Sequence, residues 1–267
     1  MCGIAGFFAA GPLRPEAPRE IEAMNACLAH RGPDDAAVWK DDEAGIALAH
    51  RRLSIIDLSP EGRQPMHSHS QRYVTIFNGE IYNFRELHHE LSARGARFRG
   101  HSDTEVMLAA IDAWGLEETL RRANGMFALA LWDRNERVLH LARDRIGKKP
   151  LYYGWAGDIL LFGSELKALL AHSQFDPQVD EHSLALFLRY NYVPAPWSML
   201  RGVFKLYPGA ILSLRKQDVA RGPSAHSPER ACRRYWDAQQ VVSSALSNPL
   251  TSSVTETVQQ LDTLLRD

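Results

Sequence analysis

The stretch Cys2-Gly3-Ile4-Ala5-Gly6-Phe7-Phe8 places a cysteine directly after the initiator methionine and an apolar run directly after that cysteine. Cysteine is small enough for Met1 to be removed, which would leave Cys2 with both a thiol and a free α-amine. An α-amine has a pKa of about 7.7–8.0, so part of it is an unprotonated base near neutral pH. A thiol beside its own base is an activated nucleophile. The apolar run predicts a buried strand over residues 3–10 that begins at this nucleophile. The alternative is that Cys2 has no chemical role.

Length and composition limit the class of protein. The chain has 267 residues, enough for one large domain or for one domain and part of a second. A net charge of −1 offers no basic field for nucleic acid or anionic lipid. The cysteines, at positions 2, 27 and 232, lack disulfide or metal-site spacing, which favours a reducing compartment. No apolar run is long enough to span a membrane, and the N-terminus lacks a signal-peptide pattern. We therefore expect a cytoplasmic protein that binds neither nucleic acid nor membrane.

Strand-like segments follow one another in groups, with helices between the groups. Apolar alternation and β-rich runs predict strands over residues 3–10, 36–40, 45–50, 51–57, 73–77, 126–132, 138–143, 151–155, 159–163 and 209–214. Amphipathic spacing predicts helices over residues 15–30, 84–95, 103–114, 116–123, 164–172 and 180–190. This order predicts an α+β fold with two mainly antiparallel sheets covered by helices.

The composition changes after Arg215. Residues 216–254 are rich in small and polar residues and predict an exposed connector. Residues 255–267 predict a helix with an unmatched apolar stripe, and a helix of this length is marginal alone. The stripe consists of Val258, Leu261, Leu264 and Leu265. We therefore expect a domain over residues 2–215, a connector over 216–254 and the start of a further domain over 255–267.

Two groups near predicted strand ends could serve a nucleophile. Arg51 and Arg52 follow a strand, and an arginine fork can hold a carboxylate, whereas the simpler interpretation of either residue alone is a surface arginine. Asn78-Gly79-Glu80 follows the strand 73–77 and is predicted to close it. An Asn amide and a Gly backbone N–H could stabilise an oxyanion, whereas the simpler interpretation is an Asn-Gly turn.

Acidic residues provide the remaining candidates. Ser102-Asp103 precedes a helix, where it could cap the helix or present a carboxylate to an ammonium group. Glu80 is a second candidate anion. Arg143-Asp144-Arg145 predicts a structural ion-pair cluster at a strand end. No histidine or cysteine spacing predicts a metal site, and no glycine-rich phosphate loop is present.

Eight sequence motifs follow one another along residues 2–215. They are Cys2-Gly3-Ile4-Ala5-Gly6, Arg31-Gly32-Pro33-Asp34, Ala49-His50-Arg51-Arg52-Leu53-Ser54-Ile55-Ile56-Asp57, Asn78-Gly79-Glu80-Ile81-Tyr82-Asn83, Ser102-Asp103-Thr104-Glu105-Val106, Gly125-Met126-Phe127-Ala128, Arg143-Asp144-Arg145-Ile146-Gly147 and Ser164-Glu165-Leu166-Lys167-Ala168-Leu169. In this order they resemble the motifs of glutamine-hydrolysing asparagine synthetases, in their N-terminal class II glutamine amidotransferase domain. The resemblance implies the αββα sandwich of N-terminal-nucleophile hydrolases.

The resemblance implies three catalytic residues. Cys2 would attack the glutamine side chain and form a γ-glutamyl thioester, with its own α-amine as the base. Asn78 and Gly79 would form the oxyanion hole. Together they imply hydrolysis of glutamine to glutamate and ammonia.

The resemblance also implies a set of glutamine-binding residues, which includes the oxyanion pair Asn78 and Gly79. Arg52, directly before Leu-Ser-Ile, would hold the α-carboxylate. Asp103 would hold the α-ammonium group, with Glu80 assisting. The pocket would be lined by Leu53, Ser54, Ile55 and Ile56.

The family has a second, ATP-dependent synthetase domain that passes the ammonia to aspartyl-AMP. Its Ser-Gly-Gly-x-Asp-Ser loop does not occur in this sequence. We therefore expect no cofactor or metal in this chain, and ATP and Mg only in the missing domain, which would be a partner in cis or in trans. A homodimer is a further open alternative. Two other functions stay open, namely a glutamine-binding or assembly module without turnover, and the amidotransferase half of a polysaccharide-cluster relative with another acceptor.

Overall fold

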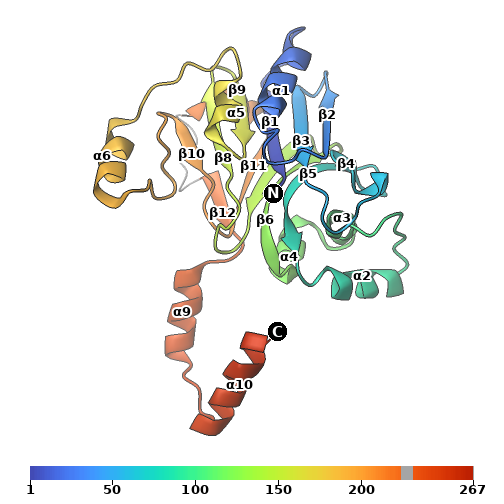
Figure 1. Ribbon diagram of the computed structural model, residues 1–267, viewed down its shortest axis with the longest axis vertical. Coiled ribbons are helices and arrows are strands. Elements are labelled where there is room, and N and C mark those ends of the chain that lie inside the picture. The colour runs from blue at the N-terminus through green and yellow to red at the C-terminus, as the bar shows by residue number, and fades with distance from the viewer. Residues whose placement is uncertain (224–230, 267) are drawn as a thin grey trace. The chain divides into compact units, whose positions relative to one another are not determined.

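Two antiparallel sheets lie face to face, each with six strands among residues 1–223 and 231–266, which are the residues that the computed structural model describes (Figure 1). The first sheet has the order β10-β8-β9-β1-β3-β2, and the second has the order β12-β11-β7-β6-β5-β4. The strands of the first sheet are β1 (Gly3–Ala9), β2 (Asp35–Asp41), β3 (Ile46–Arg52), β8 (Tyr152–Ala156), β9 (Ile159–Gly163) and β10 (Val203–Lys205). Those of the second are β4 (Met66–His67), β5 (Tyr73–Ile81), β6 (Gly125–Asp133), β7 (Val138–Arg143), β11 (Ala210–Leu214) and β12 (Cys232–Arg234).

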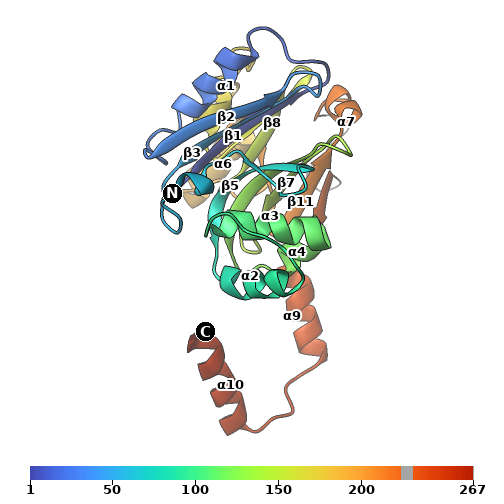
Figure 2. The same cartoon turned by 90° about the vertical axis from the view of Figure 1, so that its right-hand side faces the viewer.

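Helices cover the outer face of each sheet (Figure 2). The first sheet is covered by α1 (Ala17–Ala26) and α5 (Leu166–Leu170), and the second by α2 (Phe84–Ala93), α3 (Asp103–Trp114) and α4 (Leu116–Arg122). The chain also forms the short 3-10 helix η1 (Pro60–Gly62) and the helices α6 (Glu181–Tyr190) and α7 (Lys216–Ala220). This arrangement confirms the predicted αββα sandwich.

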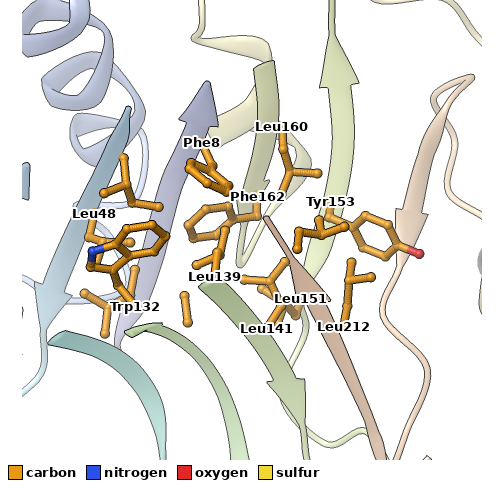
Figure 3. Close-up of a cluster of buried hydrophobic side chains, with 14 of the residues drawn as sticks. Phe8, Leu48, Trp132, Leu139, Leu141, Leu151, Tyr153, Leu160, Phe162 and Leu212 are labelled. Carbon is orange, nitrogen blue, oxygen red and sulfur yellow. The ribbon is translucent and has the colours of Figure 1, made fainter. Parts of the chain in front are cut away.

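The main core lies between the two sheets (Figure 3). Phe8 and Leu48 from the first sheet meet Trp132 and Leu139 from the second, all of them fully buried or nearly so. Successive side chains of a strand point to opposite faces, so the neighbours of Phe8 in β1 pack under α1 instead. Both faces of β1 are therefore buried, which explains its continuous apolar sequence. Each such large side chain contributes about 1.5–3 kcal/mol through burial.

Two local predictions are wrong. The strand predicted over 51–57 ends at Arg52, where β3 loses its partner β2 and the chain turns into a loop. Asn78-Gly79-Glu80 does not close a strand, because β5 continues to Ile81. Its pairing with β6 runs without a break through these residues. Tertiary pairing has therefore overridden the turn preference of Asn-Gly.

The first compact unit extends past residue 215 to Trp236. Val219 of α7 lies in the core, and β12 pairs with β11, so parts of the expected connector belong to this unit. Residues 224–230 of that connector lie outside the described residues.

The second unit begins at Asp237 and contains α9 (Ala238–Ser247) and α10 (Val254–Arg266). The predicted apolar stripe of α10 is exposed. That residues 255–267 begin a further domain stays a prediction. Of the helices in the described part of the chain, none is long and apolar enough to cross a membrane.

Candidate active site

Cys2 stands directly before β1, a central strand of the first sheet. Arg31 holds it from one side, donating from Nε to the Cys2 carbonyl at 2.9 Å and from Nη1 to Glu165 at 2.8 Å. On the other side, the Leu53 N–H donates to Cys2 Sγ at 3.4 Å. The thiol is therefore held in place by the ends of β1 and β3, which pair with each other.

One pocket, of about 570 Å³ including its open mouth, contains the thiol. All ten residues predicted for the site line it, namely Cys2, Arg52, Leu53, Ser54, Ile55, Ile56, Asn78, Gly79, Glu80 and Asp103. The other lining residues are Met1, Asp57, Gly62, Gln64, Phe77, Ser102, Thr104 and Lys149.

Along the edge of β5 that faces this pocket, every second residue points its backbone N–H and C=O groups away from β6. In an antiparallel strand, the N–H and C=O of one residue point to one side and those of the next residue to the other. The Phe77 N–H donates to Gln64 Oε1 at 2.6 Å, and the Ile81 N–H donates to Asp103 Oδ2 at 2.9 Å. Both N–H groups therefore point away from β6. Gly79, midway between these two residues, shares their orientation.

The partner of Gly79 across the ladder supports this orientation. Phe127 donates its N–H to Asp144 Oδ2 at 3.2 Å and accepts from the Asp144 N–H at 2.9 Å, so it does not use these groups toward β5. The Gly79 N–H accordingly points to the edge that lines the pocket. A Cβ at Gly79 would overlap the Met126 carbonyl, so the close approach of β6 requires glycine here.

The Asn78 side chain adds a second donor. Asn78 is only 1% exposed, and within the part of the chain that the structure describes its buried Nδ2 and Oδ1 have no hydrogen-bond partner. A buried polar group left unpaired costs about 1–3 kcal/mol, which calls for a compensating role. His50 of the first sheet fixes the strand beside it, since His50 Nε2 lies 3.1 Å from the Phe77 carbonyl. Burial lowers the pKa of His50 to about 4, so this ring is neutral at neutral pH.

Of the two candidate arginines, only Arg52 lines the pocket. Adjacent residues of β3 point to opposite faces, and Arg51 instead donates to the Asn25 carbonyl at 3.1 Å. The Arg52 guanidinium is held by the carbonyls of Ser59, at 3.0 Å, and Asp57. It lies against Gly62, where a Cβ would overlap Nη2.

Asp103 brings a buried carboxylate to the same pocket. It is the first residue of α3, and Ser102 is the N-cap, with Oγ accepting from the Glu105 N–H at 3.2 Å. Burial, assisted by the nearby Glu80 carboxylate and opposed by the hydrogen bond from the Ile81 N–H, raises the pKa of Asp103 to about 6. A charged Asp103 carboxylate is costly at this buried position, and pairing with a cationic ligand group would offset that cost.

Leu53, Ser54, Ile55 and Ile56 form the loop after β3 at the mouth of the pocket. Asp34 ties this loop down by accepting from the Ser54 N–H at 2.8 Å. Ile55 remains 58% exposed, so these residues form a rim and not a buried wall.

The Cys2 thiol is not activated by its surroundings alone. Burial raises the pKa of Cys2 above its usual 9.0, while the hydrogen bond with the Leu53 backbone and the N-terminal charge partly offset the increase. Most of the thiol is therefore protonated at neutral pH, and nucleophilic attack requires a base. In the described residues, no cluster of three or more His, Cys, Asp or Glu side chains could hold a metal ion.

Sequence reasoning missed Gln64 and Lys149. Gln64 lies in a loop, and its role becomes visible only through its hydrogen bond with Phe77. Lys149 lies in the loop after β7, outside every predicted strand and helix. The ion-pair interpretation of Arg143-Asp144-Arg145 was wrong, because the two arginines donate to backbone carbonyls and Asp144 accepts from backbone N–H groups. The cluster shapes the loop that carries Lys149.

Comparison with known proteins supports the resemblance. A family model described as a glutamine amidotransferase domain matches residues 1–228. Asparagine synthetase (glutamine-hydrolyzing) 1 of Bacillus subtilis is 41% identical over 217 residues, which cover 80% of this chain and 34% of that protein. Asparagine synthetase (glutamine-hydrolyzing) 3 of the same organism is 34% identical over 270 residues, covering 100% of this chain and 40% of that protein. The chain thus spans well under half the length of these curated relatives.

A solved structure shows the same fold. It is the glutamine phosphoribosylpyrophosphate amidotransferase of B. subtilis in complex with ADP and GMP, with a TM-score of 0.63. The match covers 88% of this chain and 49% of that chain at 19% sequence identity. At this identity the likeness concerns the fold alone.

Proposed function

Because the chain belongs to the family of class II glutamine amidotransferase domains related to glutamine-hydrolysing asparagine synthetases, we propose that it releases ammonia from glutamine with Cys2 as the nucleophile. The observation that carries the proposal is that one pocket contains a thiol, the Gly79 backbone and the Asn78 side chain, whose Nδ2 has no hydrogen-bond partner among the described residues. A thiol next to an oxyanion hole is the arrangement that acyl transfer requires.

Removal of Met1 is the first step of the proposal. While Met1 is attached, the Cys2 nitrogen is an amide and cannot accept a proton. Once Met1 is removed, that nitrogen becomes an amine in the same residue as the thiol. The amine then takes the Sγ proton as Sγ attacks the side-chain carbonyl of glutamine.

The remaining steps return the enzyme to its starting state. Asn78 and Gly79 stabilise the oxyanion, and one such donor is worth about 10²–10³-fold in rate. The carbon–nitrogen bond breaks, and the leaving nitrogen takes the proton back from the α-ammonium group to depart as ammonia. Water then attacks the thioester, and glutamate leaves as the Cys2 thiol re-forms.

Opposite charges orient the glutamine molecule. Arg52 binds the α-carboxylate, and Asp103 accepts from the α-ammonium group with Glu80 nearby. The rim formed by Leu53, Ser54, Ile55 and Ile56 contacts the methylene chain. Holding the amide next to Sγ supplies much of the rate by proximity.

The acceptor of the ammonia lies outside this chain in our proposal. The two Bacillus relatives are named asparagine synthetases, and this chain matches only 34% and 40% of their lengths. We therefore propose that a synthetase domain with ATP and Mg, in cis or in trans, uses the ammonia to convert aspartyl-AMP to asparagine.

The test is glutamine turnover by protein whose intact mass shows that Met1 has been removed. We expect ammonia and glutamate in equal amounts, no product from Cys2→Ala, and retained glutamine binding by that variant in calorimetry. Protein that keeps Met1 should be as inactive as Cys2→Ala. Undiminished ammonia release by Cys2→Ala would overturn the mechanism, and binding without turnover by the wild type would favour a glutamine-binding module.

A further inference from the structure

Lys149 lies in the glutamine pocket without a role in the reaction described so far. It is only 4% exposed, although lysine is almost never buried without a partner. Any role for it rests on the proposed function, since the pocket is the same.

The loop after β7 sets the position of Lys149. Asp144, itself 1% exposed, accepts from the Lys149 N–H at 3.0 Å and from the Lys148 N–H at 2.9 Å. Arg143 Nε donates to the Lys149 carbonyl at 2.6 Å. The N–H and the C=O of Lys149 are therefore both held by hydrogen bonds, which fix the backbone from which its side chain extends.

The Lys149 ammonium group lies beside the N-terminus. Its Nζ donates to Met1 Sδ at 3.2 Å, and a thioether is a weak acceptor. Within residues 1–223 and 231–266, it forms no salt bridge with a carboxylate. Five bonds of normal length, which span at most about 6.5 Å, separate Met1 Sδ from the Cys2 nitrogen, so Nζ lies within roughly 10 Å of that nitrogen. Removal of Met1 takes away the acceptor and leaves the ammonium group near the new α-amine.

We propose that the Lys149 ammonium group disfavours protonation of the Cys2 α-amine and so keeps this amine available as the base for the thiol. A like charge disfavours the charged form of its neighbour. At this separation, with a dielectric constant of about 20–40, the repulsion lowers the pKa of the amine by about one unit. Lys149 thus acts through Cys2 and is a positioning residue.

Other charged groups act on the same pair. Glu80 favours the charged form of Lys149, whereas burial, the largest influence, lowers the Lys149 pKa. Carboxylates near the amine oppose the effect of Lys149, and guanidinium groups add to it. The charged groups facing Lys149 and Cys2 are Glu80 of β5, Asp103 of α3, Arg52 of β3, Arg31 after α1 and Asp144 after β7.

The first test compares the pH dependence of kcat/KM for glutamine hydrolysis in wild type, Lys149→Met and Lys149→Arg, each with Met1 removed. Met matches the length of the lysine stem, and Arg keeps the charge. For Lys149→Met we expect the acidic limb of the kcat/KM profile to move to higher pH by about one unit. The value of kcat/KM should fall about tenfold below this limb and recover at high pH. Lys149→Arg should keep the limb of the wild type. An unshifted limb, or an equal loss at every pH, would overturn the proposal.

A second test does not depend on turnover. In Cys2→Ala protein, the pKa of the α-amine follows from the pH dependence of its acylation, measured by mass spectrometry of the N-terminal peptide. Adding Lys149→Met should raise this pKa by about one unit, and an unchanged value would refute the role of Lys149. Failure of the proposed function would appear in a different measurement. The wild-type protein would then release no ammonia from glutamine, whatever the titration of the amine shows.

Discussion

Replacing Asp103 with Asn should stabilise the unliganded protein while weakening glutamine binding. The carboxylate is 6% exposed and lies near Glu80, so the folded state favours its neutral form. Asn has nearly the same shape, carries no charge, and its Oδ1 can still accept from the Ile81 N–H that Asp103 now binds at 2.9 Å. The substitution therefore removes a charge that, in our account, serves only the ligand.

The magnitude follows from the two pKa values of Asp103. The pKa is about 6 in the folded protein and 3.8 for the ordinary residue, so the folded state holds more protons between these values. The contribution of Asp103 to the stability of the wild type then falls as pH rises through this window, by about 1.4 kcal/mol per unit. The free energy of unfolding of Asp103→Asn, relative to wild type, should rise from about pH 4 to pH 6 by about 3 kcal/mol and stay level above it.

The assay is urea unfolding of wild type and Asp103→Asn at several pH values between about 4 and 8. Glu43→Gln is the matched control, because Glu43 is an exposed carboxylate in a turn and its removal should change stability by less than about 0.5 kcal/mol. Calorimetry at neutral pH should show glutamine binding by Asp103→Asn weakened about 10- to 100-fold.

A stability difference between Asp103→Asn and wild type that does not depend on pH would refute the reasoning about the buried charge. If Asp103→Asn bound glutamine as tightly as the wild type, the Asp103 carboxylate would not be the ligand of the α-ammonium group. The two measurements are independent, so either part of the account can fail alone.

Three further substitutions test the pocket. Asn78→Ala should lower kcat about 10²–10³-fold with little change in KM, as steady-state kinetics would show, and a rise in KM alone would contradict an oxyanion role. Gly62→Ala should push the Arg52 guanidinium aside and raise KM without a large loss of stability, and an unchanged KM would argue against Arg52 as the carboxylate ligand. Gly79→Ala should destabilise the fold by about 1–3 kcal/mol in urea unfolding, because its Cβ would overlap the Met126 carbonyl, and a fully stable variant would contradict the close approach of β6.

Local pattern was sufficient for most of the fold. The apolar run after Cys2 predicted β1, and amphipathic spacing predicted α3 over residues 103–114, as the structure has it. The prediction that Asn78-Gly79-Glu80 closes a strand was wrong, because the short-range preference of Asn-Gly is for a turn. Its place inside β5 depends on pairing with β6, about fifty residues further along the chain. Strand ends were hard to predict for the same reason.

The site could be predicted only in part. Local pattern does not distinguish Arg51 from Arg52, and only the family resemblance selected Arg52. The structure gives the physical reason, because side chains alternate along β3 and only Arg52 lines the pocket. Lys149 and Gln64 lie in loops with no periodic pattern. The Lys149 backbone is held by Asp144 of the same loop, and Gln64 accepts a hydrogen bond from Phe77 of β5. Such residues carry no local signal.

The most direct measurement is the mass of the N-terminal peptide after protein without Met1 is mixed with glutamine and quenched in acid within one turnover. Our account predicts a peptide that is heavier by one γ-glutamyl group, attached to Cys2 as a thioester and removed by hydroxylamine. Ammonia release in the first turnover with no such adduct on Cys2, or an adduct on another residue, would contradict it.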